Sequence, residues 1–392
     1  MIVRKKIFII SLILLCIFLF FFSLQFNDTL LGFEGDRLYS QYDSQNFYEY
    51  SKITLDELFN SGSYSFIAYK FYPAYLILVD EFYTLFFNKI PYQILIFNNY
   101  FIYLFIVLMV YKFYIKKYKL PTYVLLFIIF EPSIVAFLLT IEREVLISVF
   151  LGIFFIAILE IKKLFLRVVF LLAILFLITN MRLEISLIIL LSTFLYYMYL
   201  FIRNKSKYTK IVFIFLFSLL FVILSFKISS ILELYLRHLG GTASSGGFGA
   251  LISGLPAIPR LSLYAIFYFI MPIPLFYEKN YLYQYFMMFS GLSYSFFWSF
   301  ILINYKKLEG NLIYLFIILL LLHIGLGGSL FNIRHRVDIV IPLIIMVLAL
   351  SKILIYTNGY SYLKRQYKKS FILSLTTIIV LNIVYYIMKG VL

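Results

Sequence analysis

NDTLLGFEGDRLYSQYDSQNFYEYSKITLDELFNSGSYSFIAYKF, residues 27–71, is the only long polar passage in a chain that otherwise reads as successive apolar runs. Together with the following YPAYLILVDEFYTLFF, residues 72–87, it holds half of the 18 acidic residues. These are Asp28, Glu34, Asp36, Asp43, Glu49, Asp56, Glu57, Asp80 and Glu81. Carboxylates gathered in one loop after a first apolar run indicate a site, and they predict that the remaining chain is a scaffold holding this loop over a bilayer.

The composition of the 392-residue chain points to a membrane protein. Only 13% of its residues are charged and 64% are hydrophobic, whereas a soluble domain has about 25% charged residues. The formal net charge of +16 comes from short basic clusters between apolar runs, which the positive-inside rule explains. The basic residues do not form a continuous stripe along any face, so the sequence does not indicate nucleic-acid binding.

Cysteine and metal chemistry have little support in the sequence. The single cysteine, Cys16, lies within the first apolar run, so neither an intrachain disulfide nor a cysteine-based metal site is expected. No cofactor is predicted and no clean ligand cluster marks a metal site, which leaves the use of a divalent ion open.

Eleven apolar runs are long enough to cross a bilayer. They lie near 7–26, 91–113, 121–141, 144–160, 165–180, 185–202, 210–227, 281–304, 311–328, 338–356 and 371–389. The first follows MIVRKK and lacks a small-x-small cleavage site, so it predicts an uncleaved helix with a cytoplasmic N-terminus.

Charge alternates between the connections and sets the expected orientation. Every second connection is basic, and these carry Lys112, Lys116, Lys117 and Lys119; Lys162, Lys163 and Arg167; Arg203, Lys205, Lys207 and Lys210; Lys306 and Lys307; and Lys364, Arg365, Lys368 and Lys369. Placing them in the cytoplasm puts the 27–90 loop outside. The sequence thus predicts one all-α, polytopic domain over 1–392 in the inner (cytoplasmic) membrane, with 11–12 transmembrane helices and interfacial helices in the first outer loop.

A second outer loop is expected over 228–280. Its segment 255–277 contains Pro256, Pro259, Pro272 and Pro274, and counting it as a full crossing would invert the charge pattern that follows. A re-entrant or interfacial segment is therefore favoured over a twelfth span. The glycine-rich stretch Arg237–Gly249 before it is either a plain linker or a mobile flap over a substrate.

Three other outer turns carry charges close to the membrane. They contain Glu142, Arg143 and Glu144; Arg182 and Glu184; and Arg334, His335, Arg336 and Asp338. Interfacial anchoring with arginine–carboxylate pairing explains any one of them. Because all three face the same side as the acidic loop, they also suit a phosphate or diphosphate group on a lipid-linked substrate, whose oxygens match the arginine fork.

The carboxylates of the first loop divide into candidates for catalysis and for structure. Asp43 and Asp36 are the best candidates for a general base. Thr54 and Glu57 have capping-box spacing at the start of a helix, and Asp80–Glu81 lie in an amphipathic stretch that predicts a helix on the membrane surface.

Several motifs of this chain resemble the GT-C glycosyltransferases, above all the bacterial members related to protein mannosyltransferases and aminoarabinose transferases. In the first outer loop Asp43, Ser44, Phe47, Ser51, Leu55, Gly62 and Tyr72-Pro73-Ala74-Tyr75 follow the order of the family pattern. Later landmarks are Glu131-Pro132-Ser133, Glu142-Arg143-Glu144, Met181-Arg182-Leu183 and Arg334-His335-Arg336 with Pro342. Leu76 replaces the second proline of the Pro-x-Tyr-Pro pattern, and no large soluble C-terminal domain follows.

The resemblance implies a GT-C fold and inverting transfer of a sugar from a polyprenyl-phosphate donor at the outer face of the membrane. It makes Asp43 the catalytic base, and Asp36 stays the other candidate base on the residues of the loop alone. It assigns phosphate binding to Arg182, Arg334, Arg336, Arg237 and Arg143, supported by Glu142, Glu144, Glu184 and His335. The implied partners are the lipid-linked sugar or oligosaccharide, membrane lipid and other polysaccharide-assembly proteins.

Two other functions remain open. The chain also resembles O-antigen or capsule repeat-unit polymerases, in which outer-loop arginines bind the undecaprenyl diphosphate and a whole oligosaccharide is transferred. A flippase or transporter would instead need polar residues lining a path through the spans, and Asn180 lies too close to a span end to indicate one.

Overall fold

The computed structural model describes residues 47–60, 70–86, 92–118, 129–138, 143–203, 281–330 and 334–388, with a few single residues between them. Within these ranges the chain forms helices joined by short connections, and no β-strand. The helices are α3 (Leu55–Asn60), α4 (Phe71–Thr84), α5 (Tyr92–Val110), η2 (Tyr111–Lys116), α7 (Pro132–Leu138), α8 (Glu144–Glu160), α9 (Leu164–Met181), α10 (Leu183–Arg203), α14 (Tyr281–Ile303), η3 (Tyr305–Lys307), α15 (Asn311–Leu330), α16 (Arg334–Asn358) and α17 (Tyr360–Met388).

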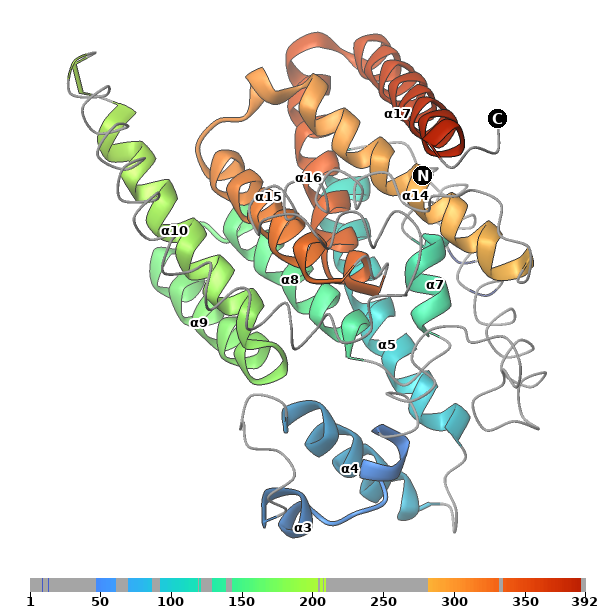
Figure 1. Ribbon diagram of the computed structural model, residues 1–392. Helices are drawn as coiled ribbons and strands as arrows, with labels where there is room; N and C mark the ends of the chain where they lie inside the picture. The colour runs from blue at the N-terminus through green and yellow to red at the C-terminus, as the bar shows by residue number, and fades with distance from the viewer. Residues whose placement is uncertain are drawn as a thin grey trace.

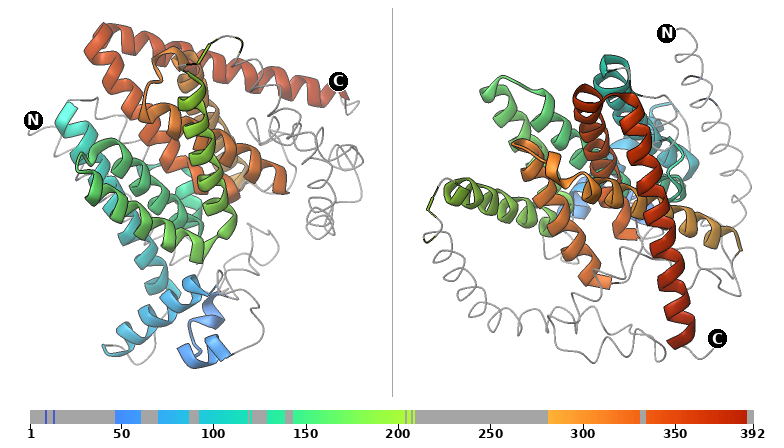
Figure 2. Two further views of the ribbon diagram at one scale, coloured as in Figure 1. Left: turned by 90° about the vertical axis from the view of Figure 1, so that its left-hand side faces the viewer. Right: turned by 90° about the horizontal axis from the view of Figure 1, so that it is seen from above.

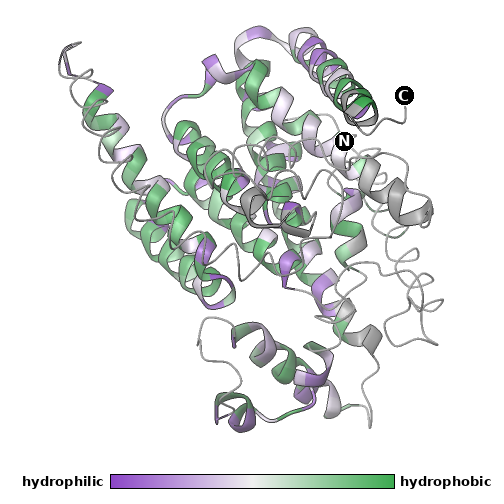
Figure 3. Ribbon diagram, in the orientation of Figure 1, coloured by the Kyte–Doolittle hydropathy of each residue, from purple (hydrophilic) through white to green (hydrophobic). Residues whose placement is uncertain are grey.

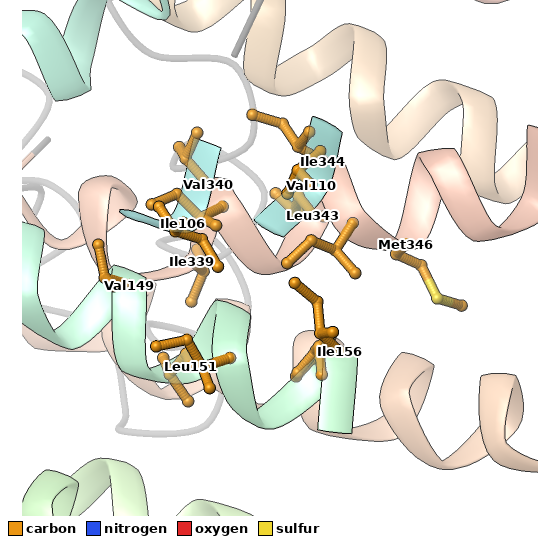
Figure 4. Packing of buried hydrophobic residues seen from close by; sticks show 14 of the residues in the cluster. Ile106, Val110, Val149, Leu151, Ile156, Ile339, Val340, Leu343, Ile344 and Met346 are labelled. Carbon is orange, nitrogen blue, oxygen red and sulfur yellow. The ribbon is translucent and has the colours of Figure 1, made fainter. Parts of the chain in front are cut away.

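Helices α8 and α16 form the centre of the bundle and run parallel to each other. The start of α8 lies beside the start of α16, where the backbone N–H of Ile341 donates to the Ser148 hydroxyl over 3.4 Å. At the other end, Glu160 lies beside Lys352. Both helices are apolar on nearly every side and buried along most of their length (Figure 4), as expected for helices enclosed by other helices.

Gly152 allows the two central helices to approach closely. A methyl group in place of its hydrogen would lie 2.6 Å from Ile341 Cγ2 and 3.2 Å from Ile345 Cδ1. The Cγ2 methyl is attached at a branched Cβ and cannot turn away without a change of χ1. A residue without a side chain at this position therefore sets the separation of α8 and α16.

The outer helices expose apolar faces that are larger than those on the surface of soluble proteins. Within the described ranges, four helical segments are long and apolar enough to cross a membrane: Asn98–Lys116, Leu164–Met181, Leu183–Arg203 and Arg336–Asn358. Of the 18-residue apolar stretch of Arg336–Asn358 in α16, 78% is buried inside the protein, whereas only 17% of the corresponding stretch of α9 is buried. The exposed surface of α9 and α10 is dominated by Leu and Phe, as Figure 3 shows by hydropathy. This arrangement, with apolar side chains both inside and outside, suits a lipid environment.

Helices α3 and α4 form a layer at one end of the bundle, below α5 and the α9–α10 turn (Figure 1). The predicted capping box is confirmed: the Thr54 N–H donates to Glu57 Oε2 over 2.8 Å, and the Glu57 N–H donates to the Thr54 hydroxyl over 3.2 Å. The predicted amphipathic helix is also confirmed as α4, which buries Tyr72 and Leu76 and exposes Glu81.

Most predicted spans within the described ranges match helices to within a few residues, but one predicted connection is wrong. Lys364, Arg365, Lys368 and Lys369 do not link two helices; they lie inside α17, which begins at Tyr360 directly after Gly359 (φ 82°). An apolar-run criterion measures hydrophobic length only, whereas lysine and arginine are good helix formers. α17 folds back from that turn and lies on the outside of the bundle (Figure 2). α16 likewise begins at Arg334, so the last outer turn is the first turn of a helix.

Candidate functional site

Three turns that are far apart in the sequence meet at the end of the bundle nearest α3 and α4. Arg182 interrupts the α9–α10 hairpin in an extended conformation (φ −160°, ψ 96°), and its Nη1 donates to Asp338 Oδ2 of α16 over 2.7 Å. Arg143, at the N-cap of α8, donates from Nη1 to the Met181 carbonyl oxygen over 3.0 Å. These two contacts join the starts of α8 and α16 to the α9–α10 turn.

We call Arg143, Glu144, Arg182, Glu184, Arg336 and Asp338 the arginine cluster. Glu144, Arg336 and Asp338 have no exposed surface, and Arg182 is 9% exposed. Removing charges from water costs several kcal/mol per ion before pairing repays it. Carboxylates at the starts of α8 and α16 are favoured by the helix dipole, whereas an arginine there is not. Such a costly arrangement at the end of a bundle of apolar helices is the strongest candidate for a functional site.

Arg336 packs against an aromatic group that the sequence alone did not indicate. Its guanidinium carbon lies 5.0 Å from the ring centre of Tyr294 in α14, a cation–π distance. The Tyr294 hydroxyl lies 2.7 Å from His323 Nδ1 of α15, and the His323 ring meets Trp298 edge to face at 5.2 Å. Isolated polar residues within apolar runs were the available signal, but nothing in the sequence indicated that they meet Arg336.

Glu131 forms a second buried polar group near the same helices. It caps α7: its Oε2 accepts from the Ile134 N–H over 3.0 Å and also from the Ser133 hydroxyl. Its Oε1 accepts from the Ser293 hydroxyl of α14 over 2.8 Å. Oε2 thus caps α7 and Oε1 joins α7 to α14, so Glu131 has a structural role in the packing of these helices.

The α3–α4 layer lies over this end of the molecule. Asn99 of α5 donates to the Tyr72 hydroxyl of α4 over 3.3 Å, and α4 also packs against α9. Lys52 pairs with Asp80 across the layer. The described part of the first loop therefore lies at the same end as the arginine cluster, as the charge pattern predicted.

Several predicted site residues lie outside the part of the chain that the structure describes. Asp36, Asp43, Glu142 and Arg237 lie outside the described residues, as does the 228–280 loop. Arg334 and His335 begin α16, with only their backbone described. The structure brings together Arg143, Glu144, Arg182, Glu184 and Arg336, the remaining predicted residues, at neighbouring helix ends. No group of three or more potential metal ligands occurs among the described residues.

Comparison with known protein families, characterised proteins and solved structures gives no match for this chain. The chemistry of the site therefore rests on its own residues. Planar guanidinium groups beside carboxylates can bind phosphate oxygens in pairs and stabilise charge that develops on a leaving phosphate.

Proposed function

We propose that the chain is a multi-pass membrane glycosyltransferase that uses a polyprenyl-phosphate-linked sugar at the outer face of the cytoplasmic membrane, in the assembly of a cell-surface polysaccharide or glycolipid. The observation that carries this proposal is the meeting of Arg143, Arg182 and Arg336 at the end of the bundle that the α3–α4 layer covers. The GT-C resemblance of that loop supplies the reaction class.

The arginines differ in how they would serve a phosphate. Arg143 is half-buried and Arg182 is nearly buried, whereas Arg336 is enclosed against Tyr294. We therefore assign direct phosphate contact to Arg143 and Arg182, and a supporting positive charge to Arg336. Asp338 orients the Arg182 fork, which carries five donors in a fixed plane.

In the proposed reaction the acceptor hydroxyl oxygen attacks the anomeric carbon of the donor sugar and inverts its configuration. The bond from that carbon to the phosphate oxygen breaks, and the electron pair leaves with the polyprenyl phosphate. Asp43 takes the acceptor's proton, with Asp36 as the other candidate base. The arginines stabilise the negative charge that grows on the leaving phosphate, which is usually the largest catalytic contribution in reactions of this kind.

The second candidate function is polymerisation of undecaprenyl-diphosphate-linked repeat units. The same arginine cluster supports it, because a diphosphate needs the same donors. The two functions differ in whether a loop carboxylate is essential, and in whether one sugar or a whole oligosaccharide is transferred.

Complementation of a deletion strain separates these functions. Asp43→Asn, Arg182→Lys and an exposed control, Lys306→Gln, are expressed at equal membrane levels and surface glycans are compared on gels. The transferase predicts that Asp43→Asn and Arg182→Lys lose one sugar while the control is normal. Chains of a single repeat on an intact core would establish the polymerase instead. A normal glycan from Asp43→Asn would remove the proposed base.

A further inference from the structure

The opposite end of the bundle contains a second charge cluster with a different construction. Glu160, the last residue of α8, accepts from Lys117 Nζ over 2.7 Å and lies 3.5 Å from Lys352 Nζ of α16. Lys352 Nζ also donates to the Tyr118 hydroxyl over 2.6 Å and lies 3.9 Å from the centre of that ring. We call Lys117, Tyr118, Glu160 and Lys352 the lysine cluster.

Two lysines share one carboxylate here, which leaves one positive charge in excess. A carboxylate at the C-terminal end of a helix is itself disfavoured by the helix dipole, so Glu160 is held by the lysines rather than by α8. Both lysine side chains remain partly exposed: those of Lys117 and Lys352 are 50% and 30% exposed, while that of Glu160 is 6% exposed. The pKa of Lys117 is raised, chiefly by its hydrogen bond to Glu160, so this lysine stays charged at any physiological pH.

The π-helical turn η2 leads directly into this cluster. It joins α5 to Lys117 and Tyr118. Single turns of π-helix are rare and often lie at functional sites. Tyr114 within it is fully buried, with its ring centre 6.4 Å from that of Tyr118. Through Tyr118 and the neighbouring Lys117, η2 brings the end of α5 to Glu160 at the end of α8. An anionic ligand would neutralise the one positive charge that Lys117, Lys352 and Glu160 leave in excess.

The surroundings favour a lipid as the source of that anion. Lys116 on η2 and Lys162 and Lys163 on the α8–α9 connection are exposed and add charge near the cluster. The following helix α9 presents exposed Leu164, Phe165 and Leu166, a surface suited to acyl chains. Basic pockets between membrane helices commonly hold anionic headgroups.

We propose that the lysine cluster is a binding site for the phosphate of an anionic lipid headgroup, in the leaflet at the end of the bundle opposite the arginine cluster. The phosphate binds Lys117 and Lys352, and Glu160 holds the two lysines in place while no lipid is bound. This site is independent of the glycosyltransferase proposal and does not take part in sugar transfer.

The test compares full-length protein in nanodiscs made of phosphatidylcholine with and without phosphatidylglycerol, using native mass spectrometry and the thermal melting temperature. Wild type and the exposed control Lys306→Gln are expected to retain phosphatidylglycerol and to melt at a higher temperature with it. Lys117→Gln and Lys352→Gln should each bind it about fivefold more weakly, since one lysine near a membrane surface contributes about that factor.

Glu160→Gln distinguishes a lipid site from an ion pair with only a structural role. Removing the competing carboxylate doubles the excess positive charge, so the proposal predicts tighter phosphatidylglycerol binding by Glu160→Gln. Unchanged or weaker binding by a folded Glu160→Gln variant, or equal binding by wild type and Lys117→Gln, would overturn the proposal. Inorganic phosphate is added to the lipid-free protein as a separate arm. Stabilisation by it equal to that by phosphatidylglycerol would reject the lipid assignment in favour of a soluble anion.

Discussion

The two ends of helix α8 carry one carboxylate each, and the protein treats them in opposite ways. Glu144 begins the helix and Glu160 ends it, about 24 Å apart at 1.5 Å per residue. Glu144 is fully buried at the end of the bundle that holds the arginine cluster. Glu160 lies between two lysines that reach toward the surface.

This difference follows from the chemistry of the two basic side chains. The arginine fork has fixed geometry and is weakly hydrated, so it tolerates burial when its donors are used. Lysine is a strongly hydrated point charge on a flexible stem and keeps contact with water. A buried arginine cluster is pre-organised for one ligand geometry, whereas a half-exposed lysine pair adapts to a mobile headgroup. We therefore assign chemistry to the first end and lipid binding to the second.

The largest effect is expected from breaking the buried Arg182–Asp338 pair. Asp338→Ala leaves Arg182 charged in a site from which water is excluded, which costs about 3–5 kcal/mol for buried pairs. Thermal unfolding in detergent checks this value. The double variant Arg182→Met with Asp338→Ala should recover much of the loss. If Asp338→Ala melts like the wild type, the pair is not buried as described.

Gly152 offers a test of the scaffold that connects the two ends. Gly152→Ala places a methyl group against Ile341 Cγ2 and is expected to cost about 1–3 kcal/mol as overpacking. Gly325→Ala is the matched control: its methyl group would lie 2.8 Å from Ile188 Cδ1 and 3.8 Å from Ile188 Cγ1, and the closer atom is the end of a side chain that can rotate. Equal melting temperatures for the two variants would show that α8 and α16 are not held at this distance.

A smaller effect is expected at the lysine cluster. Lys117→Gln removes a partly exposed ion pair and leaves Lys352 beside Glu160, so the loss of stability in lipid-free protein should be below about 1 kcal/mol. Chemical denaturation in detergent measures it. A loss as large as that of Asp338→Ala would erase the contrast between the two ends.

The smallest effect concerns pH and the α3 cap at the arginine end. The Thr54 N–H and hydroxyl lower the pKa of Glu57, which is fully exposed. The cap therefore stabilises α3 fully above the ordinary glutamate pKa and loses this contribution as the pH falls through the lowered pKa. Amide hydrogen exchange in α3 as a function of pH should show this loss in the wild type and not in Glu57→Gln. A pH response retained by Glu57→Gln would assign it to another group.

The sequence predicted the elements of this fold better than their contacts. The bounds of α8 match the prediction because charges flank a continuous apolar run, and Arg182 marked the break between α9 and α10. The start of α17 was missed because its first turns combine lysines with buried Leu363 and Ser370, a pattern that an apolar-run criterion does not detect.

The sequence did not predict which charged residues pair with each other. Arg182 and Asp338 lie 156 positions apart, and the packing of α9 on α8 and of α10 on α15, with α8 and α15 both against α16, brings them together. The sequence predicted that three charged turns share one side of the membrane, but not that their residues are buried. Tyr294, His323 and Lys352 were missed because each is one polar residue within an apolar run, with no spacing that indicates a partner.

The most direct test of the central claim is polyprenyl-phosphate binding to purified protein in nanodiscs, measured for wild type, Arg182→Lys and the exposed control Arg203→Lys. Melting temperatures establish that each variant is folded. Arg182→Lys keeps the charge and removes the fork. The account predicts at least about tenfold weaker binding by Arg182→Lys and no change in Arg203→Lys. Equal affinity of folded Arg182→Lys and wild type would contradict the assignment of phosphate binding to the arginine cluster.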